Sequence, residues 1–309
     1  MRKFKNIIAL VVFFSFAYTA MNAQSRYFDE RAVYSQHFIS PVLINPGATG
    51  INDYQQIIFN YRNKWASFEG APTTITFAYN GPVGNRLSIG GMLMRDSYGV
   101  LETNKAQFNL AYTIESEINK VSFGLSTEYI EHKATGKNLS GSLVDLSDEV
   151  LLARFDGDQF FDASFGVFGI YNNALVYGLS FPSLISSRIN ESIEELPDRD
   201  FSYIMQLGYR FTTSDSQIKM EPSLVIKSLM NVPTHIDVNM RMSFLEDRFT
   251  GGVSYTLGAE KGLGFLLGTS VDNINLNYMY DVSSLQFQDY NSGSHEIGII
   301  IDIGKEKKK

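Results

Sequence analysis

Apolar and polar residues alternate along most of the chain between residues 54 and 303. Successive residues of a strand face opposite sides, so this period of two predicts strands with one apolar and one polar face. The pattern recurs in 201–211 and 235–245. In 105–115, Phe108, Leu110, Tyr112 and Ile114 alternate with Gln107, Asn109, Ala111 and Thr113. Soluble sandwiches and membrane barrels share this alternation, so it does not separate them.

The number and length of these segments favour a membrane barrel. We expect about fourteen strands, most of them close to the roughly 9–11 residues that a tilted membrane strand needs. Soluble strands average only about 5–6 residues. The predicted fold is therefore all-β: a transmembrane, antiparallel outer-membrane β-barrel. Its strands are expected at 54–64, 73–80, 86–96, 105–115, 120–131, 160–171, 174–181, 201–211, 218–227, 235–245, 249–258, 262–271, 273–281 and 295–303.

Loop lengths indicate which end of the barrel faces outward. Bacterial barrels have short periplasmic turns and long external loops. With the start of the barrel in the periplasm, most connections after odd-numbered strands are long and should be external. The exception is 259–261, which is short. The expected external loops are 65–72, 97–104, 132–159, 182–200, 228–234 and 282–294.

Four segments are expected along the chain. Residues 1–23 read as a signal peptide, because basic Arg2, Lys3 and Lys5 precede the apolar run 7–16. A membrane anchor is the alternative, but the run is short of the ~20 residues that a spanning helix needs. Residues 24–53 form a lead-in with turn chemistry, placed in the periplasm, in the lumen as a plug, or at its inner mouth. The barrel is 54–304, and 305–309 is a basic tail, either solvated or in contact with an acidic periplasmic partner.

Charge and composition exclude several functions. The net charge is −7, and losing the three positive charges of the signal peptide makes it −10, which argues against a nucleic-acid partner. The chain has no cysteine, so disulfides and thiolate metal sites are excluded. Its four histidines are far apart in sequence and form no metal-binding motif. We therefore expect no metal, no cofactor and no enzymatic activity.

The polar strand faces should line the lumen with charges of both signs. These charges either brace the barrel by neutralising one another or form a polar route for a small solute. The charged residues expected inside are Arg62, Lys64, Glu128, Arg210, Asp237, Arg241, Asp281 and Glu296.

Two blocks around the only tryptophan carry a family resemblance, Arg62-Asn63-Lys64-Trp65 and Glu69-Gly70-Ala71-Pro72-Thr73-Thr74. With the blocks that follow, they resemble the PorP/SprF family of type IX secretion system membrane proteins, in order over about residues 27–303. The chain departs from the family at Gly47, where alanine is more usual, and from most barrels in lacking a terminal aromatic residue. The further blocks are Tyr34-Ser35-Gln36, Leu43-Ile44-Asn45-Pro46, Gly50, Asp96-Ser97-Tyr98-Gly99, Phe181-Pro182-Ser183-Leu184 and His295-Glu296-Ile297.

The resemblance implies a non-catalytic barrel in the outer membrane of a Gram-negative cell, surrounded by outer-membrane lipid. Such a barrel joins the periplasmic ring proteins of the secretion machine to that membrane, or serves the export and retention of large surface adhesins used in gliding. The alternatives are a solute channel, a fatty-acid-transporter-like barrel and a soluble secreted β-protein. The family motif gives candidate partner-binding residues at Asn45, Pro46, Arg62, Trp65, Phe68, Gly70, Ala71 and Pro72.

Trp65 and Phe68 are the large aromatic residues of this motif. Trp65 is expected either in the interfacial aromatic belt or, with Phe68, as an anchor for a partner. Gly70 and Pro72 would fix the backbone of the loop that carries them, because glycine permits unusual dihedral angles and proline locks φ.

Overall fold

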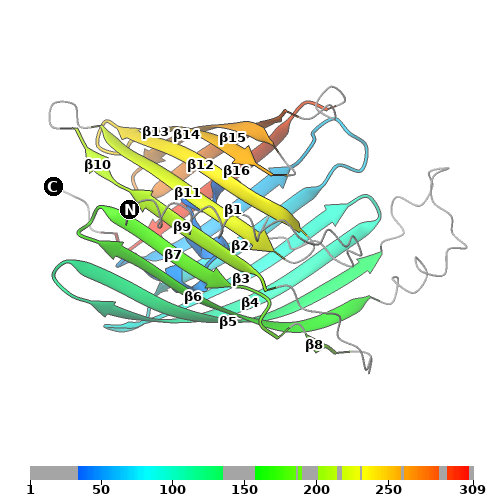
Figure 1. Cartoon of the computed structure of the whole chain (residues 1–309), viewed down its shortest axis with the longest axis horizontal. Helices are drawn as coiled ribbons and strands as arrows, with labels where there is room; N and C mark the ends of the chain where they lie inside the picture. Colours follow the sequence, from blue (N-terminus) through cyan, green and yellow to red (C-terminus); the bar gives the residue numbers. More distant parts are fainter. Residues whose placement is uncertain are drawn as a thin grey trace, which may run out of the picture.

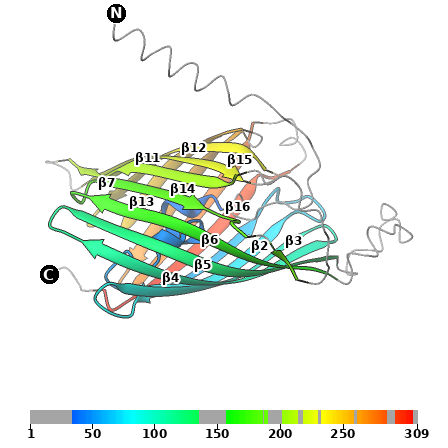
Figure 2. The same cartoon turned by 60° about the horizontal axis from the view of Figure 1, so that its bottom comes forward.

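One antiparallel sheet closes on itself to form the wall of the molecule (Figures 1 and 2). The computed structural model describes residues 34–134, 157–185, 187–189, 201–213, 218–229, 232–258, 261–284 and 291–305. The predicted signal peptide lies outside the described residues. The strands are β1 (Gln55–Asn63), β2 (Thr73–Pro82), β3 (Leu87–Tyr98), β4 (Leu101–Glu115), β5 (Asn119–Ala134), β6 (Asp158–Tyr171), β7 (Leu175–Phe181), β8 (Ser187–Arg188), β9 (Tyr203–Tyr209), β10 (Phe211–Thr212), β11 (Lys219–Leu229), β12 (Val232–Phe244), β13 (Phe249–Leu257), β14 (Gly262–Val271), β15 (Ile274–Ser283) and β16 (Ser294–Ile303).

Two pairings close the barrel, β16 with β1 and β9 with β11. β9 and β10 are two parts of one strand interrupted at Arg210, and the short β8 is a side branch that pairs with β6. The wall therefore has 14 strands, which confirms the predicted all-β antiparallel barrel. Each predicted strand has its counterpart within a few residues of the expected bounds.

The two faces of the wall differ in chemistry as the alternation predicted. Outward-facing Leu93, Phe108 and Leu125 are exposed, whereas inward-facing Asn109 and Ser126 are each 2% exposed. An exposed apolar band on the outside of a closed barrel is what a lipid environment requires.

The strand ends on either side of the long connections lie at one end of the barrel, called the loop end here, and the opposite end is called the turn end. Two expected long loops are wrong. Only Gly99 and Val100 lie between β3 and β4, because the two strands stay paired as far as Tyr98 and Leu101. Likewise, β11 and β12 extend to Leu229 and Val232, so the expected loop 228–234 is mostly strand.

The lead-in forms three short 3-10 helices, η2 (Gln36–Phe38), η3 (Pro41–Leu43) and η4 (Pro46–Ala48). Among the described residues there is no helix long and apolar enough to cross a membrane. Residues 34–53, called the plug from here on, lie within the ring of strands (the blue segment in Figures 1 and 2).

Candidate functional site: a plugged lumen beside a docked loop

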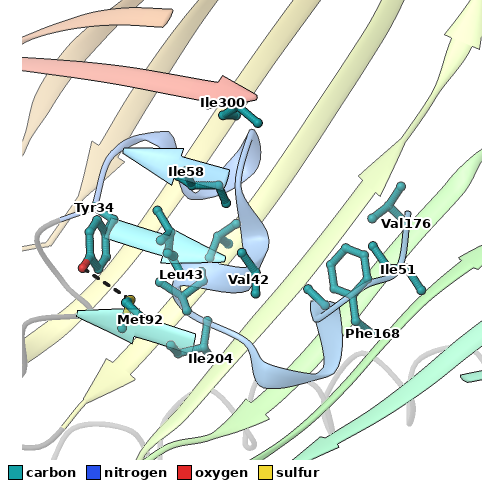
Figure 3. Close-up of a cluster of buried hydrophobic side chains, with 14 of the residues drawn as sticks. Tyr34, Val42, Leu43, Ile51, Ile58, Met92, Phe168, Val176, Ile204 and Ile300 are labelled. Carbon is teal, nitrogen blue, oxygen red and sulfur yellow. Dashed lines mark hydrogen bonds between the residues drawn. The ribbon is translucent and has the colours of Figure 1, made fainter. Parts of the chain in front are cut away.

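Apolar side chains of the plug form the core of the molecule (Figure 3). The outer face of the wall is apolar but faces lipid. The core between plug and wall is therefore the apolar surface that folding buries, and its burial stabilises the structure. The plug contributes Tyr34, Val42, Leu43, Ile44, Ala48 and Ile51, and the wall contributes Ile58, Ala78, Met92, Phe168, Val176, Ile204, Val225, Leu229, Val232 and Ile300.

The plug runs along the lumen from the loop end to the turn end. Near its start, the backbone N–H of Ser35 donates to Glu296 Oε2 over 2.9 Å, close to the loop end of β16. At its far end, Asp53 Oδ1 lies 2.6 Å from Lys120 Nζ, at the turn end of β5. The plug therefore contacts the wall at both ends of the lumen.

Glycines let the plug backbone touch the wall backbone. A Cβ atom at Gly124 of β5 would lie 2.2 Å from the Pro46 carbonyl oxygen. A Cβ atom at Gly166 of β6 would lie 2.1 Å from Asn45 Oδ1, and one at Gly47 would lie 2.8 Å from the Gly166 backbone. No real side chain fits such distances, so Gly124 and Gly166 create a slot in the wall and Gly47 lets η4 enter it.

Asn45 fixes η4 in this slot. Its Oδ1 accepts from the N–H of Gly47 over 2.9 Å, and its Nδ2 donates to the Val167 carbonyl over 3.1 Å and to Gln206 Oε1 over 3.3 Å. Asn45 and Pro46 are both buried. The structure thus places these two predicted partner-binding residues inside the barrel, where they join the plug to the wall.

A buried ion cluster ties the start of the plug to β1, β15 and β16. Arg62 Nη1 lies 2.7 Å from Glu296 Oε2 and 2.9 Å from Asp281 Oδ2. Ser35 accepts from the same guanidinium and donates from Oγ to Asp281 Oδ2 over 2.8 Å. Glu296 is 0% exposed and also accepts from Asn60 Nδ2 over 2.8 Å. A buried charge must be paired in this way, because removing one partner leaves the other uncompensated.

A second buried cluster joins the start of the plug to β11 and β12, where Lys227 Nζ donates to the Tyr34 carbonyl over 3.4 Å. Lys227 Nζ lies 3.1 Å from Asp237 Oδ2, and His37 Nε2 lies 3.6 Å from the same oxygen. The Nδ1–H of His37 donates to the Tyr34 carbonyl over 2.8 Å. Burial and the neighbouring Lys227 lower the pKa of His37 from 6.5 to about 4, although Asp237 opposes the shift. His37 is therefore neutral at neutral pH.

Most of the predicted lumen charges neutralise one another inside the barrel. Besides these clusters, Lys105 Nζ lies 2.8 Å from Glu128 Oε2, and both side chains are buried. Arg241 and Arg210 both contact Glu221, at 2.6 and 2.8 Å, although Arg210 is itself exposed at the break in its strand. These pairs support the bracing interpretation, since each charge has an opposite partner.

The loop of residues 64–72 is docked on its neighbours on both sides. On one side, the N–H of Ala66 donates to the Gly293 carbonyl over 2.7 Å. On the other, the N–H of Gly99 donates to the Gly70 carbonyl over 3.0 Å. Gly70 has φ 75°, a conformation that glycine adopts without strain. Lys64 donates its backbone N–H to the Pro72 carbonyl over 2.9 Å and so closes the loop at its base.

Within this loop the two aromatic residues differ. Trp65 packs edge-on against Tyr98 at 6.2 Å between ring centroids, with Lys64 Nζ 4.6 Å from its ring centre. Phe68 is 43% exposed, and Glu69 beside it is also exposed. Trp65 thus braces the loop, whereas Phe68 presents an apolar surface. Gly70, Ala71 and Pro72 are partly buried and shape the turn.

The structure gathers the predicted site residues into two places. Asn45, Pro46 and Arg62 belong to the plugged lumen, and Trp65, Phe68, Gly70, Ala71 and Pro72 belong to the docked loop. Sequence reasoning missed the glycine slot and the role of His37. Gly124 and Gly166 did carry a signal, since a glycine on the polar face of a strand often marks a close backbone approach. The described residues contain no group of three or more metal-ligating side chains.

Comparison with known proteins agrees with these motifs. The family model described as "Type IX secretion system membrane protein PorP/SprF" matches residues 28–301, most of the chain. The chain belongs to the PorP/SprF family. As a PorP/SprF protein it is a membrane component of a type IX secretion system, and such components are generally non-enzymatic. Membership also implies association with other components of that system, and with this fold it indicates the outer membrane.

Several solved structures resemble this PorP/SprF barrel in shape. CdiB from Acinetobacter baumannii has TM-score 0.45 and 11% identity over 82% of this chain, which spans 60% of the length of CdiB. The Ralstonia pickettii toluene transporter TbuX has TM-score 0.48 and 9% identity, covering 85% of this chain and 92% of its own. The P. putida toluene transporter TodX has TM-score 0.45 and 8% identity, covering 85% and 94%. No curated protein matches the sequence.

Proposed function

We propose that this PorP/SprF chain is a non-catalytic scaffold of the outer membrane. It holds a secretion-system partner or cargo there, for the export and surface attachment of proteins such as gliding adhesins. The observation that carries the proposal is the filled lumen. The protein uses its own plug to occupy the space that a channel would leave for a solute.

The plug argues against a solute channel because it is fixed at several independent points. Ser35 hydrogen-bonds to Glu296 and Asp281 at the start of the plug, and the Tyr34 carbonyl accepts from Lys227 over 3.4 Å. The η4 slot joins the plug to a further part of the wall, at β5 and β6. Opening a route would remove these hydrogen bonds from buried polar groups, and a buried group left without its partner costs about 1–3 kcal/mol. A wall braced in this way suits a rigid platform for another protein.

The docked loop is the proposed partner-binding surface. Phe68 supplies the exposed aromatic contact, of the kind enriched at binding hot spots. Trp65, Gly70, Ala71 and Pro72 hold the loop in one shape, so less conformational entropy is lost on binding. The expectation that long connections are external puts this loop at the cell surface, which favours a secreted adhesin as its partner. Asn45, Pro46 and Arg62 contribute indirectly by keeping the plug in place.

Affinity capture from detergent-solubilised outer membrane tests the proposal. A large surface adhesin among the retained proteins supports the cargo role, and periplasmic ring proteins support the linker role. If proteins of neither class are retained, the proposal is contradicted. Liposomes that contain the purified barrel give an independent test, since a steady flux of small solutes would favour the channel instead.

Loop variants connect this result to the docked surface. We expect Trp65→Ala and Pro72→Ala to leave the barrel assembled but to weaken partner retention. Heat-modifiable migration in gels verifies assembly of each variant. Arg86→Gln, in a turn at the opposite end of the barrel, is the control and should retain partners as the parent does. Unchanged retention and unchanged adhesin display in both loop variants would rule out this surface.

A further inference from the structure

A hollow of about 410 Å3 lies on the outer, lipid-facing surface of β2 to β5. Strand register explains it. Phe77, Leu93, Ala106 and Tyr129 are successive cross-strand partners and face outward in one row. Ala106 is the small member of this row, so the larger side chains beside it form the walls of the hollow. Its lower part is thus apolar and fits one hydrocarbon chain.

The next row toward the loop end changes from apolar to polar. Ile75, Arg95, Asn104 and Glu131 are cross-strand partners there, two residues further along each strand. Two residues of a strand span roughly 7 Å, so the apolar and polar parts of the hollow are adjacent. Arg95 and Asn104 line the same hollow as Phe77 and Leu93. The site therefore matches an amphiphile, with its chain below and its polar head above.

Near the expected position of the polar head, the basic side chains are more exposed than the acidic side chains that they contact. Arg95 contacts Glu102, and their side chains are 52% and 6% exposed. Lys133 Nζ lies 3.7 Å from Glu102 Oε1 and 3.1 Å from Glu131 Oε2, and its side chain is 35% exposed. Glu102 lies beneath both cations, and Glu131, whose side chain is 25% exposed, lies beside Lys133. Guanidinium and ammonium groups carry several N–H donors each, so they present donors outward.

We propose that this hollow binds a phosphorylated glycolipid of the outer leaflet, with an acyl chain between Phe77, Leu93 and Tyr129 and a phosphate on Arg95 and Lys133. Arginine suits the phosphate, because its planar fork matches phosphate oxygens in bidentate geometry. The glycolipid comes from the outer leaflet, because the expectation that long connections are external puts the loop end of the barrel at the cell surface. The site is separate from the proposed partner loop.

A second outward hollow, of about 470 Å3, provides a contrast. It is lined by Phe265, Leu267, Tyr278, Tyr280, Ser292 and His295, with neither lysine nor arginine among them. Tyr278 and His295 contact each other there, with 2.7 Å between Tyr278 Oη and His295 Nδ1. It can take an acyl chain but lacks a permanent cation for a phosphate, so the glycolipid is assigned to the Arg95 hollow alone.

Native mass spectrometry of the full-length, detergent-purified barrel tests the proposal. The protein is incubated with equimolar diphosphoryl lipid A and phosphatidylglycerol. We expect one lipid A molecule to be retained in preference to phosphatidylglycerol. Arg95→Gln, which removes the charge, and Ala106→Leu, which fills the hollow, should each reduce retention at least about tenfold. Arg86→Gln removes an outward arginine at the opposite end and should retain lipid A as the parent does.

Heat-modifiable migration first verifies that each variant is a folded barrel. If Arg95→Gln fails to fold, Ala106→Leu alone tests the proposal, because this substitution changes no charge and its new side chain faces lipid. Equal retention of lipid A by the parent and both site variants would overturn the proposal. So would equal retention of lipid A and phosphatidylglycerol by the parent.

Discussion

The plugged lumen and the docked loop are held by opposite means. The plug is fixed by buried side chains, namely apolar contacts, the Arg62 and Lys227 ion clusters, and glycines that admit its backbone. The loop of residues 64–72 is fixed mainly by backbone hydrogen bonds to its neighbours, which leaves Phe68 exposed. A buried polar group costs free energy unless it is paired, so the plug tolerates few changes. The loop can vary its exposed side chains while it keeps its shape.

This difference separates two kinds of candidate site residue that share one sequence motif. Arg62 and Phe68 are six positions apart, yet one is buried in a charge cluster and the other faces solvent. Substitutions in the lumen should therefore lower stability, and substitutions at the loop surface should lower binding. The predictions below test this division.

The largest effect is expected for Glu296→Gln. It leaves the buried Arg62 with a weaker set of partners, and breaking a buried ion pair costs about 3–5 kcal/mol. Urea unfolding of the detergent-solubilised barrel measures the loss. Lys219→Gln is the matched control, because Lys219 and Asp247 form an exposed pair worth at most about 1 kcal/mol. Equal losses in the two variants would contradict the role assigned to the buried cluster.

Gly124→Val should displace η4 from its slot, because the new side chain would occupy the position of the Pro46 carbonyl. Overpacking of this kind costs about 3 kcal/mol. Since the chain has no cysteine, Ala48→Cys supplies a single reporter whose thiol labelling rate rises when the plug leaves. Gly91→Val serves as control, since a Cβ there meets nothing closer than 3.6 Å. If labelling stays slow in Gly124→Val, the slot is not what holds the plug.

Acid should loosen the plug through His37. Its pKa is about 4 when docked and 6.5 ordinarily, so the undocked plug takes up a proton first as the pH falls. The contribution of His37 to docking is complete above pH 6.5 and is lost between pH 6.5 and 4. At pH 5 the loss is about 2 kcal/mol. Labelling of Ala48→Cys should accelerate over this range, and His37→Gln should remove that part of the dependence. An identical pH profile in both proteins would exclude His37 as the cause.

The smallest effect on folding is expected for Phe68→Ala. An exposed side chain contributes within about 0.5 kcal/mol of stability, so the unfolding midpoint should barely move. Partner retention in affinity capture should nevertheless fall, because Phe68 is the exposed aromatic residue of the proposed surface. A clear drop in stability, with retention unchanged, would reverse the division between lumen and loop.

Sequence patterning was sufficient for the wall but less reliable for its connections. Strand alternation is local, and lipid on one side with polar contacts on the other imposes it on every strand. The expected loop 97–104 failed because β3 and β4 continue past the apolar band. Arg95, Glu102 and Asn104 still alternate there as strand residues, but their polarity is typical of a loop. Polar residues in a paired strand and in a loop look alike when their cross-strand partners are unknown.

The candidate site was predicted in part for a similar reason. The motif around Trp65 identified the right stretch, since its glycine and proline report a shaped loop. The motif could not show that Asn45 and Pro46 dock against Val167 and Gly124, more than seventy residues away. The rows that join Phe77 to Tyr129 likewise depend on register across four strands.

By itself, the sequence determined a barrel wall of alternating strands, its even strand number and its family. Each of these follows from local periodicity or short motifs. The tertiary structure alone decided that the lead-in fills the lumen, that Arg62 and Lys227 hold it there, and that Phe68 stays exposed. These outcomes depend on which residues meet after the sheet closes. Closure brings β1 beside β16, and only then does Arg62 meet Glu296, the partner that makes its burial tolerable.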